Sequence, residues 1–471
     1  MLVPTIGIEV HVELKSKAKV YSQSKNEFSY EPNTNVSLID LGYPGTLPKL
    51  NYEVIEMALK AALALHCKIN QEMHFDRKNY FYPDLPKGFQ ITQNMTPIGY
   101  DGYLEIDVNG CKKQIGIERI HIEEDTCKSI HGESGTLLNF NRAGVPLVEI
   151  VSKPVIATPE EAVLYLEKLR ETLLYLGISD VKIEEGSMRC DANISLHEEG
   201  TEFGTKCEIK NIGSISNVGI SLNYEMKRQQ EILERGEKIL QEETRRFDDK
   251  ANKTILMRTK ETGNDYRYFP EPDLPMIHLS DEEITRVKEL LPVMPDALRE
   301  KYQSLGLNQN QMKTIIASRE LCSFYESILD KCDPIVLANY LTGDILSFMN
   351  REKISVHELK ITDEILIDFV SRMAKKEFSS KQGKEILVEL LTDGGTVDSV
   401  VDKLGIVQIS DTSVIEKTIQ EIVSANPDSV KDYHEGKDRA IKFLMGQVMK
   451  ATKGQANPSL AMELLKKELS K

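Results

Sequence analysis

The sequence has no run of apolar residues that approaches the roughly 20 needed to cross a bilayer. Its first residues, MLVPTIGIEVHVELKSK, lack the basic, apolar and small-residue regions of a secretory signal. Its seven cysteines are scattered and include no C-x-x-C pair, so neither a disulfide framework nor a Cys-rich zinc site has support. We therefore expect a reduced, cytoplasmic setting and no membrane association.

The sequence also lacks the motifs of several common enzyme classes. It contains no P-loop pattern, no G-x-G-x-x-G after a strand, no G-x-S-x-G and no H-E-x-x-H. It has no Gly/Ser-rich amidase segment with a serine nucleophile, and no cysteine in a glutaminase-like setting. If ammonia is a substrate, we expect another protein to release it from glutamine.

The composition of the chain changes near residue 290. Before it come short alternating segments with many Gly and Pro, and after it come long helical patterns of Leu, Ile, Lys and Glu. This change predicts an α+β protein with a mixed-sheet domain over residues 1–292 and an all-α helical domain over 293–406. A softer boundary near Gly405 predicts a small all-α tail domain over 407–471.

The charge of the chain is unevenly distributed. The formal net charge of −15 argues against nucleic-acid binding over the whole surface. Residues 431–471, however, hold nine Lys and Arg against five Asp and Glu. Such a segment is typical of a nucleic-acid contact, although an ordinary solvated amphipathic surface gives the same count.

One helix is well marked within the first domain. Thr158 can cap its start, Pro159 suits its first position, and Gly177 can end it in a left-handed conformation. This helix is expected to be scaffold and implies no chemistry.

The segment 6–14, IGIEVHVEL, alternates strictly between apolar and polar residues. In a strand this period places Glu9, His11 and Glu13 on one face and the aliphatic side chains on the other. A polar face turned to water would give the same pattern.

Two further segments, 187–196 and 205–210, alternate in the same way. The connection between them is turn-like, so we predict a hairpin. Its polar face would carry Arg189, Asp191, Lys206, Glu208 and Lys210.

A fourth segment, ERIHIEEDTCK at 118–128, offers His121, Glu123, Glu124 and Asp125. Strict alternation places His121 and Glu123 on the polar face and Glu124 on the apolar face. A bulge or strand end after Ile122 would reverse that assignment.

Together these segments predict a sheet face that is rich in Asp, Glu and His, with Lys and Arg among them. Hard cations such as Mg²⁺ prefer carboxylate oxygens, and phosphoryl transfer needs such cations together with Lys or Arg. Two loops rich in aromatic residues and proline, 75–93 and 255–275, have a composition beyond what a solvent-facing loop needs. A solvated sheet face with a rigid rim remains the alternative interpretation.

With these residues laid out, the sequence closely resembles the bacterial B subunits of aspartyl/glutamyl-tRNA amidotransferases. The likeness runs from residue 6 to 458. It is carried by IGIEVHVELKSKAKVYS, DRKNYFYPDLPKGFQITQ, IHIEEDTCKS, NFNRAGVPLVEIVSKP, EEGSMRCDANISL, FGTKCEIKNI, ETRRFD, RTKETGNDYRYFPEPDLP and FLMGQVMKATKGQANP.

The resemblance implies a cradle-shaped catalytic domain similar to glutamine synthetase, then a helical domain and a tail that contacts tRNA. It implies an ATP-dependent ligase that converts Glu-tRNA(Gln) or Asp-tRNA(Asn) into the amidated form, with Mg²⁺ that Mn²⁺ can replace. The implied partners are an amidase A subunit, which supplies channelled ammonia, and a small C subunit that completes a heterotrimer. No DNA or membrane partner is expected.

The resemblance also implies site residues. The metal-binding positions of the family fall on Glu9, His11, Glu124, Asp191 and Glu208, with Glu123 as the competing choice for Glu124. Arg189, Lys206 and Arg258 are the candidates for contact with ATP phosphates.

The sequence departs from the family pattern at one place. Some members carry a zinc-binding cysteine cluster soon after the first strand, where this chain reads YSQSKNEFSYEPN. We therefore expect no structural zinc.

Two other functions stay open. The chain could be a non-catalytic tRNA-binding scaffold, which would not need converging carboxylates. It could also be a stand-alone ligase that acts on free glutamate, which would leave the tail without a role.

Overall fold

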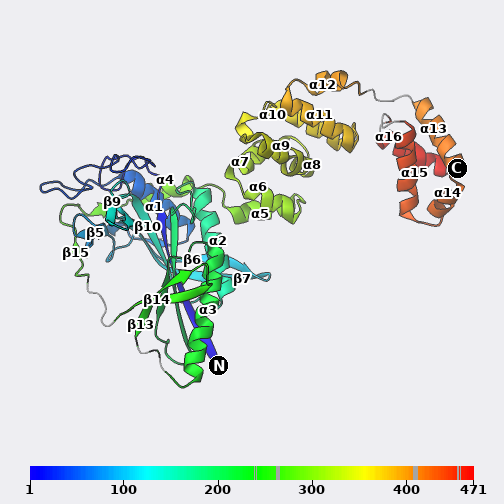
Figure 1. The fold of residues 1–471 in the computed structure, drawn as a ribbon. Helices are drawn as coiled ribbons and strands as arrows, with labels where there is room; N and C mark the ends of the chain where they lie inside the picture. The colour runs from blue at the N-terminus through cyan, green and yellow to red at the C-terminus, as the bar shows by residue number, and fades with distance from the viewer. Residues whose placement is uncertain are drawn as a thin grey trace. The chain divides into compact units, whose positions relative to one another are not determined.

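The computed structural model describes residues 1–237, 239, 241–260, 266–406, 412–452, 456 and 458–470 (Figure 1). The chain forms two compact units, Met1–Met294 and Pro295–Lys471. The boundary expected between residues 406 and 407 stays a prediction, because residues 407–411 lie outside the described part. Within the described residues, no helix is both long enough and apolar enough to span a membrane.

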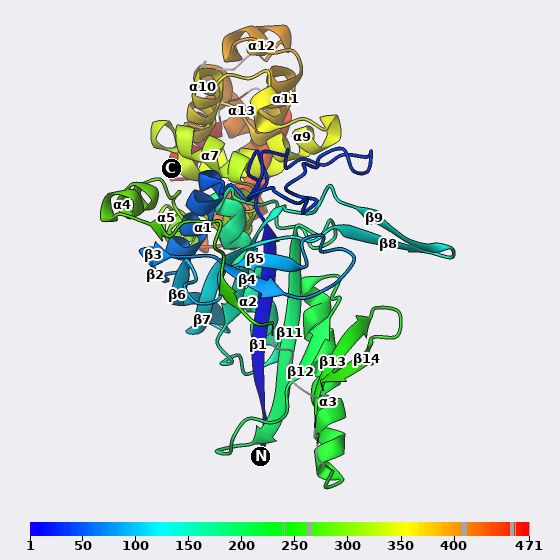
Figure 2. The same ribbon diagram turned by 90° about the vertical axis from the view of Figure 1, so that its left-hand side faces the viewer.

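A nine-stranded mixed sheet forms the centre of the first unit (Figure 2). The pair β12–β13 is parallel, and the other pairs are antiparallel. This sheet confirms the predicted α+β class, while the likeness to glutamine synthetase stays a prediction. In sheet order the strands are β14 (Lys253–Lys260), β13 (Glu242–Asp248), β12 (Cys207–Lys210), β11 (Met188–Glu198), β1 (Leu2–Glu13), β10 (Pro146–Ser152), β7 (Cys111–Glu124), β6 (Gly99–Val108) and β2 (Lys68–Ile69).

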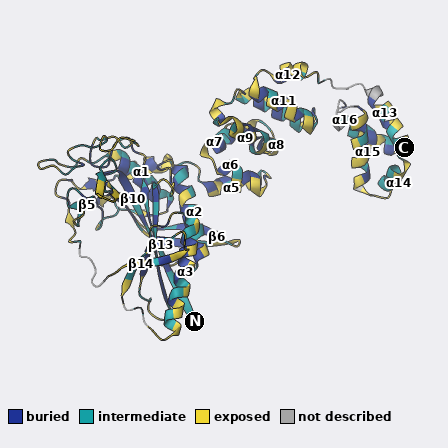
Figure 3. Ribbon diagram, in the orientation of Figure 1, coloured by how far each residue is buried: buried dark blue, intermediate teal, exposed yellow. Residues whose placement is uncertain are grey.

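The alternation in β1 divides the two faces of this sheet. Ile6, Ile8, Val10 and Val12 are at most 1% exposed and belong to the main apolar core, whereas Gly7, Glu9 and His11 between them are partly exposed. Figure 3 colours the helices and strands by burial, with buried residues in dark blue. Burying four such side chains stabilises the fold by roughly 1.5–3 kcal/mol each, which fixes the register of the central strand. The packed helices are α1 (Tyr52–Ala64), α2 (Pro159–Leu176), α3 (Ile215–Glu234) and α4 (Asp281–Glu289).

The marked helix forms as α2. The Thr158 side chain accepts a hydrogen bond from the backbone N–H of Glu161, and Pro159 begins the helix. Gly177 ends it with φ 69°, a left-handed conformation that glycine adopts without steric cost. All three sequence signals are confirmed.

Parts of the two loops rich in aromatic residues and proline form a three-stranded sheet with the order β15-β4-β5. Residues 261–265 of the second loop lie outside the described part. Arg77 pairs with Phe269 across it, and Arg77 Nε lies 2.7 Å from Oε2 of the fully buried Glu271. This ion pair and the strand pairing tie the described parts of the two loops to each other. The small strands are β3 (Glu72–Met73), β4 (Asp76–Asn79), β5 (Phe89–Thr92), β8 (Lys128–Gly132), β9 (Gly135–Asn139), β15 (Phe269–Pro270) and β16 (Ile277–His278).

The described part of the second unit is helical. Helices α13 to α16 share an apolar core that includes Ile415, Ile419, Leu444 and Leu465. The segment GQVMKATKGQANP begins within α15, but residues 453–455 and 457 lie outside the described part. The helices are α5 (Pro295–Ser304), α6 (Gln309–Ile316), α7 (Arg319–Ile328), η1 (Leu329–Lys331), α8 (Pro334–Tyr340), η2 (Leu341–Ile345), α9 (Leu346–Glu352), η3 (Val356–Glu358), α10 (Asp363–Ala374), α11 (Ser380–Thr392), α12 (Val397–Lys403), α13 (Thr412–Ala425), α14 (Pro427–His434), α15 (Asp438–Ala451) and α16 (Pro458–Leu469).

Candidate active site

A cavity of about 480 Å³ opens on the polar face of the large sheet. Strand register explains why residues distant in sequence meet there, since Glu9 lies opposite Asp191 and Asn193 lies opposite Glu208. The acidic side chains that line the cavity are Glu9, Glu123, Glu149, Asp191, Glu208 and Glu242. The basic ones are Lys78, Arg119, Lys206, Lys210 and Arg258, and two histidines, His11 and His121, complete the charged lining.

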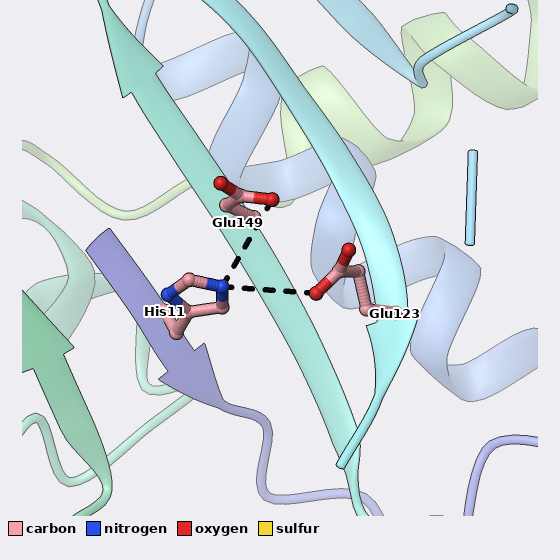
Figure 4. A group of neighbouring side chains, drawn as sticks. All are labelled: His11, Glu123 and Glu149. Carbon is pink, nitrogen blue, oxygen red and sulfur yellow. Dashed lines mark ion pairs between the residues drawn. The ribbon is translucent and has the colours of Figure 1, made fainter. Parts of the chain in front are cut away.

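His11, Glu123 and Glu149 form the first acidic cluster (Figure 4). His11 lies opposite Glu149 in the β1–β10 pair, and Glu123 reaches the same place from β7. His11 Nε2 lies 3.7 Å from Glu123 Oε2 and 3.9 Å from Glu149 Oε2. One ligand atom from each residue lies within 4.8 Å of the other two, which is close enough to share one metal ion.

His121 lies beside this cluster and is almost fully buried. Its Nε2 lies 2.9 Å from Glu149 Oε2 and 3.1 Å from Glu123 Oε1. Burial alone would lower the pKa of His121, but the two carboxylates outweigh it and raise the pKa to about 9. The same contact holds the pKa of Glu123 well below its ordinary value despite burial. At neutral pH both carboxylates are therefore ionised around an imidazolium.

Glu9, Asp191 and Glu208, the second acidic cluster, line the same cavity from the neighbouring strands β1, β11 and β12. Among the described residues, only the first cluster has three ligand atoms within 4.8 Å of one another. Lys210 Nζ lies 2.7 Å from Asp191 Oδ2 and 2.9 Å from Glu208 Oε1. The Asn193 side-chain amide donates to Glu9 Oε1 over 2.8 Å. Burial, followed by the nearby Glu149 carboxylate, raises the pKa of Glu9. A cation brought to this cluster would relieve that unfavourable burial of like charge.

Glu208 is also fixed from the neighbouring strand. The Thr244 hydroxyl donates to Glu208 Oε2 over 3.1 Å, and Thr244 lies directly opposite Glu208 in the parallel β12–β13 pair. With Lys210 on one oxygen and Thr244 on the other, the carboxylate has a defined orientation.

The two adjacent glutamates of β7 point to opposite sides of the sheet. Glu123 lines the cavity as strict alternation predicts. Glu124, within the described part of the chain, does not line it. The Glu124 carboxylate instead forms an ion pair with Lys87 and accepts a hydrogen bond of 2.9 Å from the backbone N–H of Ile91.

Arg189 lines an adjoining cavity of about 520 Å³. Asp125 draws it there, because Arg189 Nη2 lies 2.7 Å from Asp125 Oδ2. His11, Lys78, Glu123, Asp191 and Lys210 line both cavities, so the two are continuous along one side.

Arg258 reaches the cavity through an irregularity in its strand. Arg245 pairs with Leu256 but Thr244 pairs with Arg258, so Met257 is an extra residue in β14. Such a bulge turns the following side chain to the other face. Without it, Arg258 would share the face of Thr254 and Leu256 and point away from the cavity.

The sequence reasoning missed Glu149, Lys78 and Lys210 as site residues. Glu149 is the one charged residue in PLVEIVS, and a lone acid within an apolar strand is the signal that could have identified it. Lys78 lies in the loop at 75–93. Burial lowers the pKa of Lys78, but Glu123, Tyr268 and Glu149 together outweigh burial and raise it. Lys210 belongs to the predicted polar face of β12.

Comparison with known proteins agrees with this geometry. Residues 4–285 match the family described as the GatB/GatE catalytic domain, and residues 323–469 match the GatB domain. Several proteins named as the B subunit of an aspartyl/glutamyl-tRNA(Asn/Gln) amidotransferase are similar over nearly the whole chain. Those of Geobacillus thermodenitrificans and Geobacillus kaustophilus are 49% identical over 470 residues, which is 99% of this chain and 98% of each relative. That of Halalkalibacterium halodurans is 48% identical over the same shares. The chain therefore belongs to the family of amidotransferase B subunits that contain the GatB/GatE catalytic domain.

Proposed function

We propose that this chain converts Glu on tRNA(Gln), Asp on tRNA(Asn), or both, into Gln and Asn at the expense of ATP. The observation that carries the proposal is the convergence of two acidic clusters and several cationic side chains in one cavity. The family to which the chain belongs supports the same reaction, because its relatives are named as components of tRNA amidotransferases. The chain is thus the ligase component of a larger enzyme.

The reaction needs activation of a carboxylate, because oxide is too poor a leaving group for ammonia to displace. The γ-phosphoryl group of ATP is transferred to a side-chain oxygen of the aminoacyl group, which gives an acyl phosphate and ADP. Ammonia then attacks the carbonyl carbon, and the carbon–oxygen bond to phosphate breaks. Lys78, Lys206 and Arg258 line the cavity and are suited to offset negative charge on the transferred group.

The donor set of the cavity fits hard divalent cations. His11, Glu123 and Glu149 would hold one ion, because their ligand atoms lie within 4.8 Å of one another. Glu9, Asp191 and Glu208 face the same cavity and would supply further carboxylate contacts to cations that arrive with ATP. Carboxylate oxygens with a single imidazole suit Mg²⁺ or Mn²⁺. When bound, such ions neutralise charge on the phosphates of ATP. His121 orients Glu123 and Glu149, and Lys210 orients Asp191 and Glu208, before any ion arrives. Glu124, although implied by the resemblance, is replaced by Glu123 in this assignment because of its direction.

The partners are inferred from a step that this chain is not expected to carry out, the release of ammonia from glutamine. An amidase A subunit would supply ammonia through a channel, and a small C subunit would complete the heterotrimer. We assign catalysis to residues 1–292, a connecting role to 293–406 and contact with the tRNA body to 407–471. The match of residues 323–469 to the GatB domain supports the assignment of both helical segments to the amidotransferase family.

Substituting Asp191 tests the catalytic assignment. In the complete A·B·C complex with Glu-tRNA, ATP and glutamine, Asp191→Ala should abolish formation of Gln-tRNA, because the second cluster loses a carboxylate that faces the cavity. Binding of tRNA should remain largely intact. Both are measured on the same preparation, by acid-gel analysis of the aminoacyl group and by filter binding.

Glu198→Ala is the matched control, because Glu198 is an exposed acid at the end of the same strand. It should retain wild-type conversion. Full conversion by Asp191→Ala would remove this cavity as the reaction site.

The same preparation separates the competing functions. A non-catalytic scaffold would show no ATP hydrolysis that depends on charged tRNA. A stand-alone ligase would amidate free glutamate. Running Glu-tRNA and Asp-tRNA in separate reactions identifies the physiological substrate.

A further inference from the structure

Glu225 is a fully buried carboxylate on α3, outside the cavity. Its Oε2 lies 2.8 Å from Arg228 Nη2, and its Oε1 lies 3.1 Å from Arg245 Nε. The Thr254 hydroxyl also donates to Oε1. A charge buried in this way is stable only with such a complete set of partners.

The partners of Glu225 lie on the last two strands of the large sheet. Arg245 belongs to β13 and Thr254 to β14, and the Arg245 guanidinium donates to the Thr254 hydroxyl over 2.9 Å. Arg245 Nη1 and Arg228 Nη2 lie 2.9 Å and 2.8 Å from the same oxygen of Glu243. One buried network therefore joins α3 to both strands of the β13–β14 pair.

The cavity lies on the other side of this pair. Along β13, Glu243 and Arg245 face α3, whereas Thr244, between them, bonds Glu208. The bulge at Met257 begins three residues after Thr254 and turns Arg258 toward the cavity. The register that the Glu225 network fixes on one face thus sets the positions of Thr244 and Arg258 on the other.

The Arg258 side chain has few contacts of its own that would fix its position in the cavity. Strand β14 is the outermost strand of the sheet, and the Arg258 side chain is exposed. No hydrogen bond or ion pair joins this side chain to another part of the described chain. Its place in the cavity therefore depends on the backbone of β14, and edge strands without an anchor slip in register more readily than central ones.

We propose that Glu225 is a positioning residue for phosphoryl transfer, which holds β13 and β14 in the register that presents Arg258 and orients Glu208. This inference rests on the proposed function, in which Arg258 contacts ATP phosphate. It adds a residue that touches neither ATP nor metal and acts from the opposite face of the sheet.

The test is Glu225→Gln in the A·B·C complex, with steady-state kinetics in ATP and in charged tRNA. Glutamine keeps the shape but removes the charge that holds Arg245 and Arg228. The KM for ATP should rise about tenfold, the scale of one lost charged hydrogen bond. The KM for charged tRNA should stay within about twofold, because most contacts with the tRNA body are assigned to residues 407–471 and only the aminoacyl end enters this cavity. A purely structural loss would instead lower the active fraction and leave both KM values unchanged.

Glu231→Gln is the control, since Glu231 is an exposed acid on the same helix. It should leave both KM values at the wild-type level. If Glu225→Gln also leaves the KM for ATP unchanged, the inference is overturned.

A double-variant cycle shows whether Glu225 acts through Arg258. Arg258→Ala alone should raise the KM for ATP, and adding Glu225→Gln should cost little more, because the side chain being positioned is gone. A full second loss would show that Glu225 acts by another route, such as Glu208, and would overturn the proposed action through Arg258. An unchanged KM in Arg258→Ala would instead refute the phosphate contact assigned to Arg258, while the Asp191 result tests the reaction site separately.

Thr254→Val is a second variant that tests the same inference if Glu225→Gln does not fold. It keeps the volume of the side chain but removes the hydroxyl that links Glu225 and Arg245 to β14. The KM for ATP should rise in the same direction by a smaller factor. A folded Thr254→Val protein with the wild-type KM for ATP would overturn the inference.

Discussion

At the scale of single residues, Glu13 on the polar face of β1 has a carboxyl group whose ionised form is unfavourable in the folded state. Burial, followed by the nearby Asp125 carboxylate, raises the pKa of Glu13 to about 7, against the lowering effect of Arg189. The native state therefore binds this proton more tightly than the unfolded chain does. Between the unfolded pKa near 4.5 and the folded pKa near 7, Glu13 makes the protein progressively less stable as pH rises.

Glu13→Gln should consequently stabilise the protein at pH 8, by about 2 kcal/mol after allowance for solvent screening. At pH 5 the gain should be much smaller, because Glu13 is then largely protonated in the native state. Urea denaturation of the purified chain at the two pH values measures the difference in unfolding free energy. Glu118→Gln, at an exposed position of β7, is the control. An equal gain at both pH values would contradict the pKa assignment.

Individual site residues could be predicted where alternation alone decides direction. The period of β1 places Glu9 and His11 toward the cavity, and the period of β7 places Glu123 there and turns Glu124 to Lys87. Arg189 lines the adjoining cavity, because Asp125, 64 residues away, draws it there. Such long-range pairing cannot be read from local spacing.

At the scale of elements, helix α2 was predictable from its ends and the β11–β12 hairpin from two alternating runs joined by a turn-like connection. The place of Glu149 was not, because it depends on β10 lying next to β1, and strand order is a property of the whole sheet. The direction of Arg258 depends on a bulge that no glycine or proline marks in TILMRT. A bulge without such a marker residue depends on how β14 pairs with β13, which local spacing does not show.

The last four helices, α13 to α16, allow a prediction at this scale, because they bury a core of their own. Removing residues 407–471 should raise the KM for charged tRNA sharply, since contacts with tRNA phosphates supply most sequence-independent affinity. The KM for ATP should stay within about twofold, because the cavity lies in the first unit. Steady-state kinetics of the truncated complex measure both constants.

Raising the salt concentration provides the control for this truncation. The full-length complex should lose tRNA affinity as salt rises, and the truncated one should show a shallower slope. An unchanged KM for charged tRNA would contradict the role assigned to the tail.

At the scale of the whole molecule, the two faces of the large sheet have different roles. Its apolar face packs against helices and supplies the core, and its polar face brings acids from β1, β7, β10, β11 and β12 into one cavity. The buried network around Glu225 couples the two faces at the edge of the sheet. This arrangement gives a chain without a P-loop or G-x-G-x-x-G motif a cavity lined by both acidic and basic side chains, which phosphoryl transfer requires.

The central claim is that this cavity activates the side-chain carboxylate by phosphorylation, and the most direct measurement follows its oxygen. Glu-tRNA with ¹⁸O in the side-chain carboxylate is converted by the complete complex with ATP and glutamine, and the released phosphate is analysed by mass spectrometry. We predict one ¹⁸O atom in phosphate for each fully labelled Gln-tRNA formed, and no such transfer with Asp191→Ala. Gln-tRNA formed without ¹⁸O in phosphate would contradict the account.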